Sequence, residues 1–227
     1  MKRGFTILAI VTGLLLSFAL YAALIAAPTE RTMGDVQRIF YYHVPSAWTA
    51  FLLFFVNFAA SIVYLVRRNP RADAIALTAA EVGLVFLTVN LVTGPIWARP
   101  VWGIWWTWDW RLTSTLVVWL IYVSYLMLRR FSASSQTAVL ASVMGIFGAI
   151  CVPFVYFSIW IFRTQHPSPV LGDNGSLDPR MAHVLLINWA AFLCLGWLMG
   201  WTRYRLEVLK REVEEAQALE SLLEGQR

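Results

Sequence analysis

The chain contains 227 residues, of which 59% are hydrophobic and only 14% are charged. A soluble domain carries about 25% charged residues because water must wet its surface, so this composition excludes an ordinary soluble protein and predicts a membrane protein. The formal net charge of +5 does not indicate a nucleic-acid-binding protein, because the basic residues lie in short clusters between apolar runs.

Six apolar segments are long enough to cross a bilayer as helices, since a spanning helix needs about 20 mostly apolar residues. The first segment is longer than the apolar core of a signal peptide, which covers about 7–15 residues, so we expect it to be retained. The sequence therefore predicts an all-α polytopic membrane protein with six transmembrane helices. The predicted spans are Phe5–Ala27, Trp48–Val66, Ala74–Pro95, Leu112–Leu128, Ala138–Phe162 and Val184–Trp201.

Lysine and arginine residues are distributed unequally over the two sides of this predicted bundle. Twelve of the eighteen lie on the side of both termini, which assigns that side to the cytoplasm by the positive-inside rule. Three external loops follow from this orientation, at about residues 28–47, 96–111 and 163–183. The cytoplasmic set consists of Lys2, Arg3, Arg67, Arg68, Arg71, Arg129, Arg130, Arg203, Arg205, Lys210, Arg211 and Arg227.

The other six basic residues are arginines in external loops that also carry histidine or tryptophan. Two interpretations are open for them. They anchor helix ends at the lipid headgroups, or they bind anionic groups such as carboxylates, whose geometry suits a guanidinium. These residues are Arg31, Arg38, Arg99, Arg111, Arg163 and Arg180.

The C-terminal segment differs in character from the apolar segments before it. Leu206, Leu209 and Val213 recur at helical spacing among glutamates, which is typical of a water-facing amphipathic helix. We therefore divide the chain into a six-helix membrane domain, residues 1–203, and a cytoplasmic helical tail, residues 204–227. The tail is either solvated or docks a partner.

The densest feature of the sequence is the segment Trp97–Arg111, which holds six of the chain's twelve tryptophans. An aromatic belt at the membrane interface explains one or two tryptophans per helix end, but not six in one loop. In either of two conformations the segment offers a broad aromatic surface suited to a flat hydrophobic ligand. A helix would present Trp102, Trp105 and Trp106 on one face, whereas an extended chain would present Trp106, Trp108 and Trp110.

Two charged residues end this segment. Asp109 directly precedes the fourth predicted span, where a carboxylate accepts hydrogen bonds from the free backbone N–H groups of a helix start. Capping that helix is compatible with ordering the tryptophan loop. Arg111 either pairs with Asp109 or faces a carboxylate of a ligand.

The three histidines of the chain are His43, His166 and His183, and all are predicted on the external side. A lone histidine is usually a structural residue, but three beside one tryptophan surface favour a binding site. Neutral imidazole is a common axial ligand of heme iron, and two such ligands would hold a heme against the aromatic surface. The spacing alone does not choose two of the three.

Other polar groups are weaker candidates. Glu81 lies about two turns from the cytoplasmic face, and we interpret it as a helix-packing or partner-contact residue, like the asparagines within the spans. Cys151 and Cys194 lie in apolar runs without a CxxC or CxxCH sequence, which indicates packing residues and excludes a c-type cytochrome. The sequence contains no nucleotide-binding loop, HExxH motif or nucleophile elbow, so no hydrolytic chemistry is indicated.

Two runs of residues resemble one known family. The run Trp102-Gly-Ile-Trp-Trp-Thr-Trp-Asp-Trp-Arg111-Leu-Thr resembles the WWD signature of bacterial heme-handling proteins, in the form found in the cytochrome c maturation protein C family, also called heme exporter protein C. The run Arg38-Ile-Phe-Tyr-Tyr-His43-Val-Pro45 resembles the first external loop of that family. The size and the six spans agree over almost the whole chain.

This resemblance implies a set of ligands for a non-covalently bound heme b. The second axial histidine of the family follows an aromatic end of the fifth helix and precedes an Asp-Pro-x-Met stretch, here Asp178–Met181, so His43 and His166 are implied as the iron ligands. His183 then becomes a helix-start residue. The implied roles of the others are to hold the porphyrin (Trp102, Trp105, Trp106 and Trp108), to order the surface (Asp109) and to contact propionates or a partner (Arg38, Arg99 and Arg111).

The resemblance also implies partners and a location. Members of the family lie in the bacterial inner membrane, present heme on its periplasmic side and deliver it to a heme chaperone, cytochrome c maturation protein E. They assemble with an ABC-type ATPase and its membrane partner, cytochrome c maturation proteins A and B, and with a small single-span protein, cytochrome c maturation protein D. The chain would thus be a heme-binding and transfer subunit rather than an enzyme, surrounded by membrane lipid.

Two other functions are kept as alternatives. A c-type cytochrome heme lyase of the WWD group is the first, although such proteins are typically larger and have histidines deep within spans, which this chain lacks. A heme-free membrane subunit of an ABC transporter with an unusually heavy aromatic belt is the second.

Overall fold

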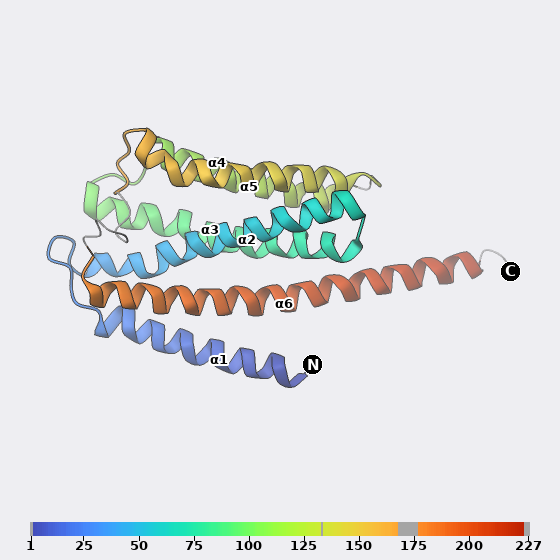
Figure 1. The fold of residues 1–227 in the computed structure, drawn as a ribbon, viewed down its shortest axis with the longest axis horizontal. Coiled ribbons are helices and arrows are strands. Elements are labelled where there is room, and N and C mark those ends of the chain that lie inside the picture. The colour runs from blue at the N-terminus through green and yellow to red at the C-terminus, as the bar shows by residue number, and fades with distance from the viewer. Residues whose placement is uncertain (1, 133, 168–176, 225–227) are drawn as a thin grey trace.

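The computed structural model describes residues 2–132, 134–167 and 177–224. Within these ranges the chain is helical throughout apart from short connections, and the six predicted membrane-spanning helices are confirmed. Figure 1 shows them running side by side along the long axis of the molecule. The helices are α1 (Lys2–Tyr21), α2 (Phe40–Arg67), α3 (Pro70–Trp102), α4 (Trp110–Phe131), α5 (Thr137–Ile161) and α6 (Pro179–Glu224), with a π-helical turn at Ala22–Ala26 and a 3-10 turn at Asp35–Ile39.

Two helices extend further towards the predicted external side than we expected. The 3-10 turn at Asp35–Ile39 leads directly into α2, so that His43 lies on a helix and not in a loop. The predicted end of the third span at Pro95 is also wrong, because α3 continues to Trp102. Prolines are tolerated inside membrane helices. Each proline removes one backbone donor, and the carbonyl that is left without its partner is satisfied by neighbouring groups in the bundle. The helix ends where Gly103 adopts a left-handed φ of 79° and its N–H bonds the Arg99 carbonyl at 3.0 Å.

The helices pack as neighbouring pairs around α2. Helix α2 packs along α3 and also contacts α5 and α6, while α4 and α5 pack against each other and α1 packs along α6. Both termini lie towards one end of the bundle, the terminus end, which also carries the α2–α3 and α4–α5 connections (Figure 1). The opposite end, the loop end, carries residues 103–109 and 162–167. The tryptophan loop therefore lies across the bundle from both termini.

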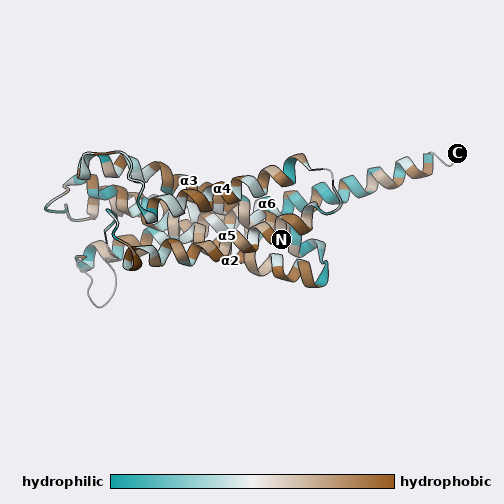
Figure 2. Cartoon of the chain, turned by 90° about the horizontal axis from the view of Figure 1, so that it is seen from above, coloured by the Kyte–Doolittle hydropathy of each residue, from teal (hydrophilic) through white to brown (hydrophobic). Residues whose placement is uncertain are grey.

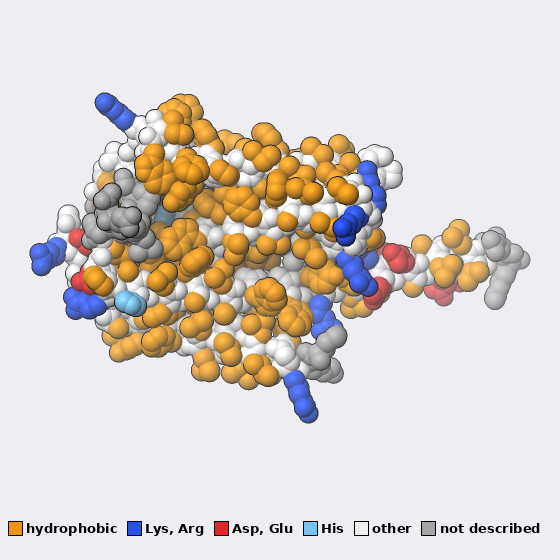
Figure 3. Space-filling model, viewed as in Figure 1, with side chains coloured by type: hydrophobic (Ala, Val, Ile, Leu, Met, Phe, Trp, Pro, Cys, Tyr) orange, Lys and Arg blue, Asp and Glu red, His pale blue; other side chains and the backbone are white. Residues whose placement is uncertain are grey.

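The surface divides into three zones along the same axis. Apolar side chains cover the middle of the bundle, and lysine and arginine side chains gather at the two ends (Figure 3). The same division is visible in the hydropathy of the ribbon (Figure 2), where hydrophilic residues concentrate at both ends. Apolar residues such as Ile7, Leu14 and Phe147 are more than half exposed, which fits contact with lipid chains.

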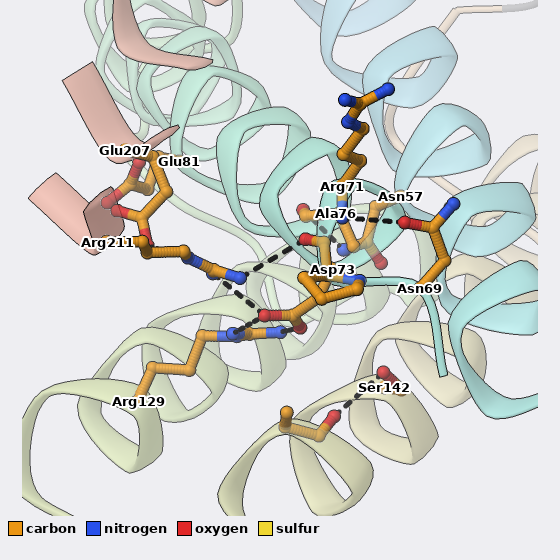
Figure 4. Close-up of polar contacts among 12 residues, drawn as sticks. Asn57, Asn69, Arg71, Asp73, Ala76, Glu81, Arg129, Ser142, Glu207 and Arg211 are labelled. Atoms are coloured by element: carbon orange, nitrogen blue, oxygen red, sulfur yellow. Dashed lines mark hydrogen bonds and ion pairs between the residues drawn. The ribbon is translucent and has the colours of Figure 1, made fainter. Parts of the chain in front are cut away.

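An ionic cluster at the terminus end ties three helices together. Asp73 of α3 pairs with Arg129 of α4 and, at 2.8 Å, with Arg211 of α6 (Figure 4). Helix α6 runs without a break past the predicted boundary at residue 203, and Arg203 pairs with Glu81 at 2.6 Å, so Glu81 is a helix-packing residue as expected. The members of the cluster are Asp73, Glu81, Arg129, Arg203, Glu207 and Arg211.

Candidate functional site

His43 projects from the first turns of α2 onto α3. Its Nδ1 lies 3.0 Å from the hydroxyl of Thr93, and the side-chain amide nitrogen of Asn90 lies 3.1 Å from its Nε2. The indole of Trp97 packs edge-on against the imidazole, with ring centroids 5.8 Å apart. These three residues of α3 were not among the predicted site residues. Their spacing of i, i+3 and i+7 on one predicted helix is the signal that would have shown them on a common face.

The tryptophan loop adopts neither of the two conformations in full. Helix α3 ends at Trp102, so a helical face shared with Trp105 and Trp106 does not form. Residues 103–109 are not helical; Trp106 is half-buried there and packs edge-on against Trp108 at 5.9 Å between centroids. Trp105 and Trp108 are 60% and 77% exposed. The loop thus presents two exposed indoles beside one half-buried indole.

Asp109 serves both as a helix cap and as a link between loops. One oxygen of its carboxylate accepts from the backbone N–H of Leu112 at 2.9 Å, which confirms the expected capping of α4. The other oxygen accepts from the backbone N–H of Gln165 at 3.0 Å and from the Thr107 hydroxyl at 3.2 Å. A single side chain therefore joins the tryptophan loop to the loop that carries His166.

His166 follows the end of α5 and is half-buried. Its Nδ1 donates to the carbonyl of Pro167 at 2.8 Å, since a carbonyl only accepts, and this leaves the lone pair on Nε2. Burial, and then the nearby Arg111 guanidinium, lower the pKa of His166 from 6.5 to about 4. The imidazole is therefore neutral at physiological pH, which is the form that coordinates a metal.

Arg111 lies near both histidines. It donates to the carbonyls of Val155 and Tyr156 at 3.1 and 3.3 Å, near the end of α5. Its positive charge lies within electrostatic range of the imidazoles of His43 and His166. The two imidazoles also lie within electrostatic range of each other. The chain thus brings residues from the first, second and third external segments to one place at the loop end.

The other predicted site residues have contacts within the protein. Arg38 pairs with Asp35 at 3.0 Å and donates to the Ala23 carbonyl at 2.8 Å, and Arg99 donates to the Gly103 carbonyl. Both arginines therefore bond backbone carbonyls close to helix ends. His183 is exposed on α6 and bonds the carbonyl of Pro179, one turn earlier in the same helix, at 2.6 Å. The residues 168–176 of the third predicted external loop, and Arg227, lie outside the described residues.

The donor set at the loop end fits a heme. Two neutral imidazoles suit the two axial positions of the iron, and aromatic faces suit the porphyrin. The indole N–H groups of Trp97 and Trp106 are buried and find no hydrogen-bond partner among the residues that the structure describes. Together with the Arg111 guanidinium, these donors match the carboxylates at the edge of a heme.

Comparison with known protein families shows which family the chain belongs to. The family model described as heme exporter protein C matches residues 1–219, which is nearly the whole chain. The chain belongs to the heme exporter protein C family. The expected family membership is thereby confirmed.

Individual relatives of the family show the same breadth of similarity. The heme exporter protein C of Bradyrhizobium diazoefficiens is 36% identical over 217 residues, covering 94% of this chain and 82% of the relative. A putative cytochrome c biosynthesis ccmC-like mitochondrial protein of Marchantia polymorpha is 34% identical over 80% of this chain and 78% of the relative. The heme exporter protein C of Escherichia coli strain K12 is 31% identical over 82% of this chain and 76% of the relative.

Proposed function

We propose that this chain is the heme-binding membrane subunit of a cytochrome c maturation system. It presents heme b, bound without a covalent link, at its loop end on the periplasmic side of the bacterial inner membrane, and passes it to the heme chaperone, cytochrome c maturation protein E. The observation that carries the proposal is that His43, His166 and Arg111, from distant segments, lie within electrostatic range of one another, with Asp109 joining the loops of Arg111 and His166. The names of the relatives support a role in heme export and cytochrome c biosynthesis.

The residues of the loop end divide the work of holding the heme. His43 and His166 would hold the iron, which would accept a lone pair from each imidazole. The tryptophans hold the ring by contact with its faces, and the arginines neutralise its carboxylates, because guanidinium groups pair well with carboxylates. Asp109 orders the surface through its bonds to both loops. The proposed ring and carboxylate contacts are Trp102, Trp105, Trp106, Trp108, Arg38, Arg99 and Arg111.

The chain acts as a carrier and not as an enzyme in this proposal. Hydrolysis of ATP falls to the partner ATPase, cytochrome c maturation protein A, which acts together with its membrane partner and the small single-span protein, cytochrome c maturation proteins B and D. The name heme exporter, which several relatives carry, supports such an assembly. The part of α6 after residue 203 is proposed to lie in the cytoplasm; beyond Arg211 it is exposed and extends away from the bundle at the terminus end (Figure 1).

An absorption spectrum of the protein, purified in detergent from heme-supplied membranes, tests the site. We expect a bound-heme spectrum with two histidine ligands in the wild type, and its loss in His43→Ala and in His166→Ala. His183→Ala is the matched control, because this histidine is exposed and bonded within its own helix, and it should keep the spectrum. A spectrum that survives the first two substitutions and disappears in the third would overturn the ligand assignment.

The transfer step is tested with the purified heme chaperone. Mixing the heme-loaded chain with the heme-free chaperone should move heme from the first protein to the second, and the chaperone should end with a covalent heme. Covalent attachment of heme to a CxxCH peptide by this chain alone would instead support the heme lyase alternative. A protein that binds no heme, even with the chaperone present, would support the heme-free transporter subunit.

A further inference from the structure

One face of α3 surrounds the imidazole of His43. Asn90, Thr93, Gly94 and Trp97 recur at i, i+3, i+4 and i+7, and all four approach the ring. Gly94 allows the closest approach, because a Cβ atom there would lie 3.3 Å from Cε1 of His43. The orientation of the ring is therefore set by α3 as much as by its own helix.

The hydroxyl of Thr93 selects the position of the ring proton. The hydroxyl donates its single proton to the Val89 carbonyl of its own helix, with 2.8 Å between the two oxygen atoms. The hydroxyl oxygen then meets Nδ1 of His43 at 3.0 Å as an acceptor, so Nδ1 must carry the proton. The lone pair of His43 consequently lies on Nε2.

The amide of Asn90 lies over a face of the ring. Its nitrogen is 3.1 Å from Nε2 and 3.3 Å from Nδ1, whereas a donor placed on the lone pair of Nε2, which points outward in the plane of the ring, would be much farther from Nδ1. The amide donates to the backbone carbonyl of His43 at 3.1 Å. Asn90 therefore leaves the lone pair of Nε2 free.

We propose that Thr93 is a positioning residue that sets how firmly His43 holds the heme iron. This inference rests on the proposed function of His43 as an iron ligand. Thr93 fixes the tautomer that leaves the lone pair of Nε2 for the iron, in the way that outer hydrogen bonds orient most metal-bound histidines.

The test compares variants of the full-length protein, purified in detergent and loaded with hemin. Two quantities are measured: the visible spectrum, and the rate at which heme is lost to an excess of apomyoglobin. Thr93→Val keeps the shape of the side chain but removes the acceptor, and it should accelerate heme loss by about 10- to 100-fold and weaken the two-histidine spectrum. Thr93→Ser should restore both values to those of the wild type.

Equal behaviour of Thr93→Val and Thr93→Ser would overturn the role of Thr93. The melting temperature of each heme-free variant shows whether the fold itself has changed.

Thr88→Val is the matched control on the same helix. The hydroxyl of Thr88 bonds the carbonyl of Leu84 at 2.8 Å and accepts from the indole of Trp119 at 2.8 Å, away from His43. It should leave the rate of heme loss unchanged. His43→Ala separates the role of the ligand from the roles of its neighbours. If it retains heme as the wild type does, the proposed ligand is wrong; if it loses heme while the Thr93 variants match the wild type, only the present inference fails.

Discussion

The carboxylate of Asp109 accepts a hydrogen bond at 3.0 Å from the backbone N–H of Gln165, the residue before His166. The other oxygen of the same carboxylate caps α4 through the N–H of Leu112. The start of a membrane helix and the position of a proposed iron ligand are therefore set by one side chain. A ligand loop that is held in this way needs little further ordering when heme binds.

Asp109→Asn separates these two roles. Asparagine is as good a helix cap as aspartate, but it has a single acceptor oxygen, so the cap is kept and the bond to Gln165 is lost. We expect heme affinity to fall about tenfold, since a hydrogen bond to a charged group contributes about 1.5–3 kcal/mol. The melting temperature of the heme-free protein should change little. Asp109→Ala should lower both, because it also removes the cap, and equal heme affinity in all three proteins would contradict this account.

The lowered pKa of His166 predicts a pH dependence of stability. The unfolded chain takes up a proton on this histidine near pH 6.5, whereas the folded protein does so only near pH 4. Between these values the unfolded state binds more protons, so the folded state loses stability as the pH falls from 6.5 towards 4. The melting temperature of the heme-free protein should therefore drop more between pH 7 and pH 5 in the wild type than in His166→Gln. Parallel curves would show that His166 does not contribute.

The ionic cluster at the terminus end should matter for stability and not for heme. The side chains of Asp73 and Arg129 are only 6% and 10% exposed. Asp73→Asn leaves the Arg129 charge buried without its partner, which typically costs about 3–5 kcal/mol. We expect a clear fall in melting temperature with an unchanged heme spectrum. Lys210→Gln, which removes an exposed ion pair, is the control and should change neither quantity.

Close packing of α5 against α2 makes Gly145 intolerant of a side chain. A Cβ atom there would lie 2.3 Å from the side-chain oxygen of Asn57, which is fully buried and donates to the Ala76 carbonyl at 2.8 Å. Gly145→Ala should destabilise the protein by about 1–3 kcal/mol through overpacking. Gly13→Ala in α1 is the control, because a Cβ there meets nothing within 4 Å and alanine favours a helix. Equal melting temperatures for the two variants would contradict the tight contact.

The features that depend on residues close together in the sequence were determined by the sequence alone. The lengths of the apolar runs predicted the six helices, because the thickness of the bilayer sets a minimum for each. The position of Asp109 just ahead of an apolar run predicted its capping of α4, since a cap acts within one helical turn. The end of the third helix was not predicted correctly. The prolines of α3 did not end it, because packing within a bundle compensates a missing backbone bond.

The features that join distant residues were decided only by the tertiary structure. The residue spacing left open which histidines lie near each other, and the packing of the helices places His43 and His166 within electrostatic range of each other and of Arg111. The same holds for the approach of Asn90 and Thr93 to His43, and for the pairing of Asp73 with Arg211. Hydropathy and periodicity describe which face of a helix is apolar, but not which helix it meets. That choice depends on the shapes of all the side chains in the bundle together, because interiors are close-packed.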